Sequence, residues 1–144
     1  MKQLGIALAL AALGCWAPVA TPELGSHFEP KNRHELTLIA SAQMSPAETT
    51  RVGGITFTVA VNDQNRVIYV QSQDSAFRTP EGLSIDSTLA QVLSAGGKAV
   101  VYETGWAHYS QLPSGWCAVF YGPQSDLFKA PTSNSMVSGF FKRR

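Results

Sequence analysis

The chain has 144 residues, with 11 Lys and Arg against 10 Asp and Glu, and a formal net charge of +1 at neutral pH. A charge this balanced gives no electrostatic reason to expect a nucleic-acid partner, and the length suffices for one folded domain but hardly for two. Charged residues make up only 15% of the chain, so Ser, Thr, Asn and Gln supply much of the polar surface, as is common in exported proteins.

Residues 1–14 have the pattern of a secretory signal peptide. Lys2 supplies a positive charge, an uncharged apolar run extends from Leu4 to Leu13, and the small residue Gly14 closes the run. The run has about half of the roughly 20 apolar residues that a membrane-spanning helix needs. We therefore expect residues 1–14 to be removed on export, and we expect no later stretch to span a membrane.

The segment Ala12-Leu13-Gly14-Cys15 resembles the lipobox of bacterial lipoproteins, although Leu is more usual at its first position. In that family the cysteine becomes the lipidated first residue of the mature chain. The resemblance implies lipid attachment at Cys15 and, because Trp16 rather than Asp follows, an outer-membrane location that faces the periplasm. The alternative is ordinary cleavage after the glycine or near Ala17 or Ala20, which would give a soluble periplasmic or secreted protein.

Cys117 is the other of only two cysteines, which are too few for a disulfide framework. It lies between Trp116 and Ala118 in an apolar run, where a single cysteine is usually a small buried hydrophobic residue. A disulfide with Cys15 and a reactive thiol are the alternatives, although no neighbouring basic residue is present to stabilise a thiolate. We expect Cys117 to belong to the core.

Residues 15–34 are expected to form a lipidated tether, and residues 35–144 to form a single, mainly β domain. The tether contains three prolines and one glycine and shows no lasting periodicity, a composition typical of linkers. At the other end of the chain, the three basic residues 142–144 are interpreted as a solvated tail.

A β-hairpin over residues 55–71 is the clearest pattern in the chain. Alternate residues from Ile55 to Val61 are apolar, residues 62–65 form a turn, and residues 66–71 form the returning strand. A weaker alternation predicts an earlier strand over residues 35–42. Pro46 and the Gly53-Gly54 pair are interpreted as turns.

A short amphipathic helix is expected next, because one apolar stripe contains Ile85, Leu89, Val92 and Leu93. Ser84 or Asp86 can cap its start, and Gly96-Gly97 can end it. The last strands are expected over residues 99–110, 116–122 and 136–141, with a turn at 112–115. We therefore predict an α+β fold, in which an antiparallel sheet of about five to six strands packs on one short helix.

Residues 77–92, FRTPEGLSIDSTLAQV, resemble a segment of small uncharacterised exported proteins and lipoproteins of proteobacteria. In those proteins a strand leads into a T-x-E-G-L-x-I-G-x-T turn and then a short helix. Asp86 stands where a glycine is usual, and the matching residues are Thr79, Glu81, Gly82, Leu83, Ile85 and Thr88. The resemblance implies a turn that launches a helix against a sheet, and it implies no activity.

No pattern in the sequence indicates a catalytic residue, a metal site or a cofactor. His27, His34 and His108 lack the close spacing of metal ligands, and no serine lies in a nucleophile motif. The carboxylates of residues 81, 86 and 103 could serve as an acid–base pair, but nothing selects two of them. An enzyme that brings distant residues to His108 is the least favoured function.

Aromatic residues crowd the segment 102–121. The simplest interpretation is that they pack in the core. A second interpretation is that the outward-facing members form a binding surface together with the turn at 112–115, since Trp and Tyr are enriched at the centres of protein interfaces. The candidate binding residues are Tyr102, Trp106, Tyr109, Leu112, Trp116 and Tyr121.

Together, the export signal and the lack of catalytic patterns predict a non-enzymatic envelope lipoprotein that binds another envelope protein. An inhibitor, an immunity protein and an assembly accessory all fit this description. A glycan- or lipid-binding periplasmic module that uses the same aromatic residues is the alternative.

Overall fold

The computed structural model describes residues 20–121 and 129–144. The elements in these ranges are β1 (Leu36–Ala40), β2 (Gln43–Val52), β3 (Ile55–Val61), β4 (Val67–Ser72), α1 (Leu89–Ser94), β5 (Val101–Glu103), β6 (Ala107–Gln111), β7 (Cys117–Phe120) and β8 (Gly139–Arg143). Among the described residues, no helix is long and apolar enough to cross a membrane.

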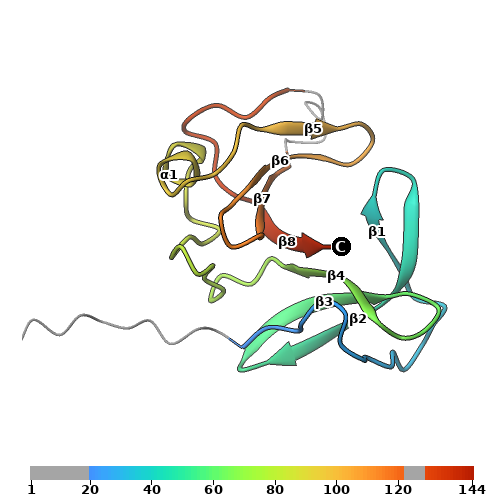
Figure 1. Ribbon diagram of the computed structural model, residues 1–144. Coiled ribbons are helices and arrows are strands. Elements are labelled where there is room, and N and C mark those ends of the chain that lie inside the picture. Colours follow the sequence, from blue (N-terminus) through green and yellow to red (C-terminus); the bar gives the residue numbers. More distant parts are fainter. Residues whose placement is uncertain (1–19, 122–128) are drawn as a thin grey trace, which may run out of the picture.

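All eight strands belong to one antiparallel sheet with the spatial order β1-β2-β3-β4-β8-β7-β6-β5. The chain therefore runs through two meanders. The first, β1 to β4, ends in the middle of the sheet; the chain then crosses to the far edge and returns from β5 to β8. Pairing of β4 with β8 joins the two meanders. The sheet curls into a half-barrel, with α1 at one side (Figure 1).

The predicted α+β fold with five to six strands is wrong: the part of the chain that the structure describes is mostly antiparallel β, with eight strands and one six-residue helix. Two features of the chain account for the extra strands. One is the strand β2, whose residues include a proline, and the other is a turn that divides residues 99–110.

β2 contains Pro46, which we interpreted as a turn. The first part of β2 pairs with β1, where Pro46 lies opposite Leu36, and the pairing with β3 begins only at Ala47. Proline lacks a backbone N–H and is tolerated in a strand where no ladder bond needs that donor. Because Pro46 precedes the ladder to β3, the strand continues through it.

The expected strand over residues 99–110 is divided into β5 and β6 by a tight turn. The amide of Trp106 donates to the carbonyl of Glu103 at 3.0 Å, and Gly105 has a φ of 76°, a conformation that glycine adopts without strain. β5 and β6 therefore pair with each other as a hairpin. The last strand also begins later than expected, at Gly139 instead of residue 136.

The helix begins one turn later than the apolar stripe suggests. Thr88 is its N-cap, and Thr88 and Gln91 form a reciprocal capping box. The expected caps Ser84 and Asp86 lie in the preceding turns instead. Leu89 and Val92 are the buried residues of the helix.

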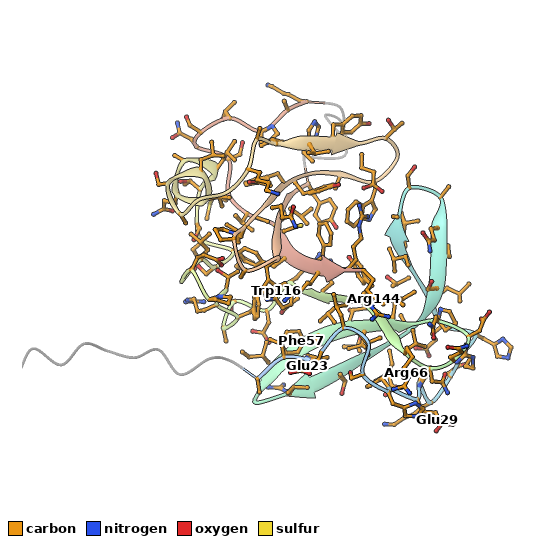
Figure 2. The ribbon with its side chains drawn as sticks, in the orientation of Figure 1. Glu23, Glu29, Phe57, Arg66, Trp116 and Arg144 are labelled. Atoms are coloured by element: carbon orange, nitrogen blue, oxygen red, sulfur yellow. The ribbon has the colours of Figure 1, made fainter. Side chains whose placement is uncertain are left out.

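The predicted hairpin of residues 55–71 is confirmed as β3 and β4, which pair in antiparallel register with an irregularity next to Val61. Alternate residues of β3 enter the larger core cluster, on the outer face of the sheet. The segment between β4 and β5 covers this cluster. Its Phe77 ring contacts those of Phe57, Trp116 and Phe140 at centroid distances of 4.8–5.7 Å. Figure 2 labels Phe57 and Trp116, which come from the two different meanders.

A second, smaller core cluster lies on the concave face and includes Ile39, Tyr69, Cys117 and Phe141. Both faces of the sheet are therefore covered by side chains over much of their area. Cys117 is a free, buried cysteine, as expected for a core residue.

Part of the expected tether lies against the sheet. The amide of Gly25 donates to the carbonyl of Val67 at 2.8 Å, and the amide of Phe28 donates to Asn65 at 2.8 Å. Leu24 and Phe28 also pack against the larger core cluster. Among the described residues, contacts with the sheet thus begin near Leu24, within the stretch expected to be the tether.

Candidate functional site

Two of the six candidate binding residues are core residues. Leu112 is 2% exposed and Trp116 is 4% exposed, and both belong to the larger core cluster. The Trp116 ring lies 4.8 Å from that of Phe77. At the turn between β6 and β7, Leu112 and Trp116 therefore point inward, and we leave both out of the candidate site.

Trp106 and Tyr109 lie half-buried on the concave face. Trp106 packs edge-on against Phe141 with ring centroids 4.6 Å apart, and Tyr109 does so at 5.2 Å. Tyr69 from the first meander stacks on the same Phe141 at 5.9 Å. These four rings line the concave face at the end of the half-barrel where the edges near β1 and β5 come together.

Tyr102 and Tyr121 are the exposed members of the six. Tyr102 is 40% exposed and lies over the buried ring of His108, at 4.5 Å between centroids. Tyr121 is also exposed. It lies close enough to Tyr69 to contribute to the raised pKa of the Tyr69 phenol, whose main cause is burial.

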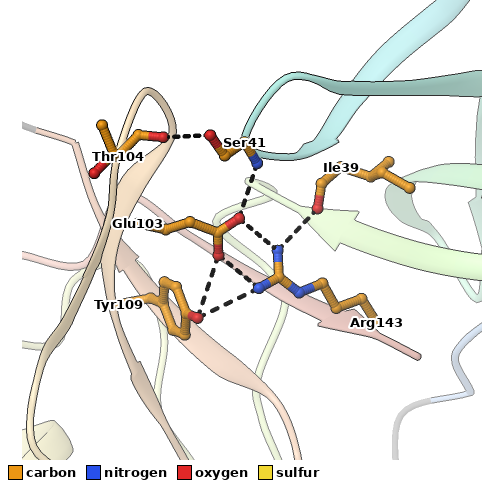
Figure 3. A network of polar contacts seen from close by, with 6 residues as sticks. All are labelled: Ile39, Ser41, Glu103, Thr104, Tyr109 and Arg143. Atoms are coloured by element: carbon orange, nitrogen blue, oxygen red, sulfur yellow. Dashed lines mark hydrogen bonds and ion pairs between the residues drawn. The ribbon is translucent and has the colours of Figure 1, made fainter.

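Arg143 joins the two edges of the sheet at one end of the half-barrel (Figure 3). Its guanidinium donates to Glu103 at 2.6 and 3.3 Å, to the backbone carbonyl of Ile39 at 3.1 Å and to the Tyr109 hydroxyl at 3.3 Å. The register of β1 shifts between Leu38 and Ala40, and the Ile39 carbonyl in this irregularity is the one that Arg143 contacts.

Ser41 completes this arrangement from the turn after β1. Its amide donates to Glu103 at 2.8 Å, and its hydroxyl donates to the carbonyl of Thr104 at 2.6 Å. We call the set of Ile39, Ser41, Glu103, Tyr109 and Arg143 the latch. Arg143 belongs to β8, in the middle of the sheet, whereas β1 and β5 are its two edges. One side chain of β8 can contact both edges only when the sheet curls around it, so the latch holds the sheet in its curved shape.

The latch also changes the electrostatics of its members. Hydrogen bonds from Arg143 are the main cause that holds the pKa of Glu103 below its usual range. Burial raises the pKa of Tyr109, so its phenol is neutral and can both donate and accept. The Arg143 guanidinium also lies 4.8 Å from the centre of the Trp106 ring, in cation–π contact. Arg143 is therefore a structural residue, and our interpretation of it as part of a solvated tail is wrong.

A polar pocket of about 510 Å³ opens on the concave side of the first meander. Side chains from three adjacent strands and the segment after β4 line it: Thr49, Thr56, Thr58, Gln71, Gln73 and Asp74. Thr49, Thr58 and Gln71 lie directly opposite one another in the strand register. The pocket therefore has a row of hydroxyl and amide groups across β2, β3 and β4.

Asp74 is fixed at the end of the pocket. Its carboxylate accepts hydrogen bonds from the amides of Thr56 and Ala76, both at 2.9 Å. These bonds are the main cause of the lowered pKa of Asp74, and the charge of Arg51 contributes to it. The carboxylate is thus ionised at neutral pH.

An apolar patch on the outer face of β1 and β2 was missed by the sequence analysis. In the strand register Leu36 lies opposite Pro46, and Leu38 lies opposite Met44. Leu36 and Met44 are each 53% exposed, whereas the core clusters include none of the four. We call these four residues the β1–β2 patch. The alternation of residues 35–42 indicated one half of it, but the other half lies in the unexpected strand β2.

The carboxylates and histidines that could support catalysis belong to different parts of the fold. Glu81 accepts hydrogen bonds from the amide and hydroxyl of Ser114 at 2.7 and 3.0 Å, and Glu103 belongs to the latch. His108 is buried in the second meander, whereas His27 precedes β1. Within residues 20–121 and 129–144, no three His, Cys, Asp or Glu side chains gather as metal ligands.

Cys15, the expected lipidation site, lies outside the described residues. Comparisons of the chain with protein-family models, with curated proteins and with solved structures find no match.

Proposed function

We propose that the protein is a non-enzymatic, lipid-anchored protein of the cell envelope that binds another envelope protein through the β1–β2 patch and the adjoining edge of β1. The observation that carries the proposal is the patch itself: four apolar side chains on one face of a hairpin at the border of the sheet. Exposed apolar patches next to polar residues are typical of protein interaction sites.

The edge of β1 supports the same surface. β1 is the first strand of the sheet and pairs only with β2 among the described residues. Its sequence, LTLIA, contains no charged residue and no proline, the features with which natural edge strands avoid unwanted pairing. A partner strand can therefore add to the first part of β1, before the irregularity where the Ile39 carbonyl accepts from Arg143, through main-chain hydrogen bonds, a common mode of peptide recognition.

The surroundings of the patch resemble an interface rim. Glu48 follows Pro46 on the same face of β2, and it forms an ion pair with Lys31 at 3.9 Å. Covering the exposed halves of the Leu36 and Met44 side chains contributes about 1 kcal/mol each. Solvent-exposed charges at the rim add little affinity but favour one orientation of the partner.

The export signal supports the cellular part of the proposal. A lipid at Cys15 would hold the domain at the outer membrane, facing the periplasm, with the short stretch up to Leu24 as the connection. The separation of the carboxylates and the burial of His108 support a binding role over an enzymatic one.

The proposal is tested by purification of the partner from solubilised envelopes with the full chain as bait. The variant Leu36→Lys, Met44→Lys should recover at least tenfold less of a partner that the parent protein retains, because two charges then lie in the apolar contact. The matched control is Gln64→Lys in the exposed β3–β4 turn, which adds a charge away from the patch. Equal recovery with all three proteins, each shown to be folded by circular dichroism, contradicts the proposal.

A further inference from the structure

The polar pocket of the concave face is a candidate ligand site that is separate from the β1–β2 patch. Thr49, Thr58 and Gln71 form a row across three strands, and neighbouring strands lie about 4.8 Å apart. The row is therefore about 10 Å long. The pocket volume of about 510 Å³ lies within the usual range for small-molecule sites.

The chemistry of the lining selects a neutral ligand rich in hydroxyl groups. Each threonine hydroxyl can donate one hydrogen bond and accept others, and each glutamine amide can donate two and accept two. None of the described residues that line the pocket is cationic, and the Asp74 carboxylate disfavours an anion. An acyl chain would cover these polar groups and leave them without hydrogen-bond partners, which would cost binding free energy for each group.

Several lining groups are held in place before any ligand binds. The Tyr69 hydroxyl donates to Gln71 at 3.1 Å, which leaves the amide nitrogen of Gln71 available as a donor. Backbone amides fix the Asp74 carboxylate. Such preorganisation reduces the entropy that a site loses on binding.

Gly139 of the neighbouring strand β8 has no side chain, and this leaves room for the Gln73 side chain at the pocket. A Cβ atom at this position would lie 3.0 Å from the Gln73 side chain and 3.2 Å from the Ser72 carbonyl. The bare backbone of Gly139 thus lets Gln73 lie over β8, at the border of the pocket.

From this geometry we infer that the concave pocket binds a neutral oligosaccharide, with the row of Thr49, Thr58 and Gln71 and the Asp74 carboxylate as its hydrogen-bonding partners. The pocket and the β1–β2 patch lie on opposite faces of the sheet. Binding at one of them can therefore be measured and lost independently of the other.

The inference is tested by NMR titration of the ¹⁵N-labelled full chain, in a detergent without a sugar head group. The probes are maltotriose, cellotriose and chitotriose, with a pool of neutral tripeptides in parallel. At least one oligosaccharide should give saturable shifts at the amides of Thr56, Thr58 and Gln71. No saturable shift with any of the three, or saturation by the tripeptides alone, overturns the inference.

Variants then locate the site. Thr58→Val keeps the shape of the side chain and removes the hydroxyl, so it should weaken binding about tenfold. Thr50→Val is the matched control, because this neighbouring threonine lies on the other face, opposite Phe57 in the register. Equal affinity of Thr58→Val and the parent protein places the sugar elsewhere and overturns the inference.

Discussion

Removal of the Arg143 guanidinium should destabilise the protein by about 3 kcal/mol. Arg143→Met retains much of the packing of the side-chain stem but removes four hydrogen bonds, two of them to Glu103. The side chains of the ion pair are 26% and 19% exposed. Its contribution to the free energy of unfolding therefore lies between those of surface pairs and buried pairs, at about 2 kcal/mol. The loss of the contact with the Trp106 ring adds about 1 kcal/mol.

The assay is urea unfolding monitored by far-UV circular dichroism. In a domain of this size the expected loss corresponds to a decrease in the melting temperature of about 10 °C. Lys142→Met is the matched control, because the ammonium of the neighbouring Lys142 has no hydrogen bond or ion pair with the described residues and lies 5.9 Å from the centre of the Trp116 ring. We expect this control to remain within about 0.5 kcal/mol of the parent protein.

A double-mutant cycle with Glu103→Gln isolates the ion pair from the other contacts. We expect a coupling energy of about 2 kcal/mol between Arg143 and Glu103. A coupling below about 0.5 kcal/mol would show that Arg143 acts through packing alone and that the latch does not hold the two edges together.

Four further outcomes follow from the structure. The pKa of Glu103 is depressed in the folded state. The stabilisation that ionised Glu103 provides is therefore present above the ordinary carboxyl pKa of about 4.3 and is lost as the pH falls through the lower folded value. In urea titrations from pH 6 to 3, the difference in unfolding free energy between the parent protein and Glu103→Gln should shrink, and a constant difference contradicts this. Burial raises the pKa of Cys117 to about 11, so iodoacetamide at pH 8 should label it only in urea, and rapid labelling of the native protein would show that the thiol is accessible. Trp116→Ala should cost about 3–5 kcal/mol as a core truncation, whereas parental stability would place Trp116 on the surface. Gly139→Ala should cost about 1–2 kcal/mol through contact with Gln73 and Ser72, and an unchanged melting temperature would show that the Gln73 side chain moves aside freely.

Local patterns in the sequence were sufficient to predict the elements whose two faces differ strongly. β3 and β4 follow from the alternation of residues 55–71, because one side of that hairpin enters the larger core. The helix was also predicted, although the capping box at Thr88 determines its start more strongly than the apolar stripe does. The strand count was wrong partly because β2 has weak alternation and contains a proline. Whether such a segment forms a strand depends on the neighbours with which its two halves pair, and the local sequence does not reveal these neighbours.

The candidate surfaces depend on long-range pairing, which the sequence alone does not reveal. Leu112 and Trp116 suggested an exposed tip, but the segment between β4 and β5 folds back over them through Phe77. Arg143 suggested a solvated tail until the pairing of β8 with β4 placed it on the concave face. The pocket likewise needs three strands in register, since no single strand contains its row of polar groups.

The most direct test of the proposed function is site-specific photo-crosslinking in intact envelopes. A photoreactive residue replaces Leu36 in the full chain, and a matched variant carries it at Leu93, an exposed leucine of α1 outside the β1–β2 patch. We expect one discrete protein adduct from position 36 and none from position 93. Adducts at position 93 with none at position 36 would contradict the assignment of the β1–β2 patch as the contact surface.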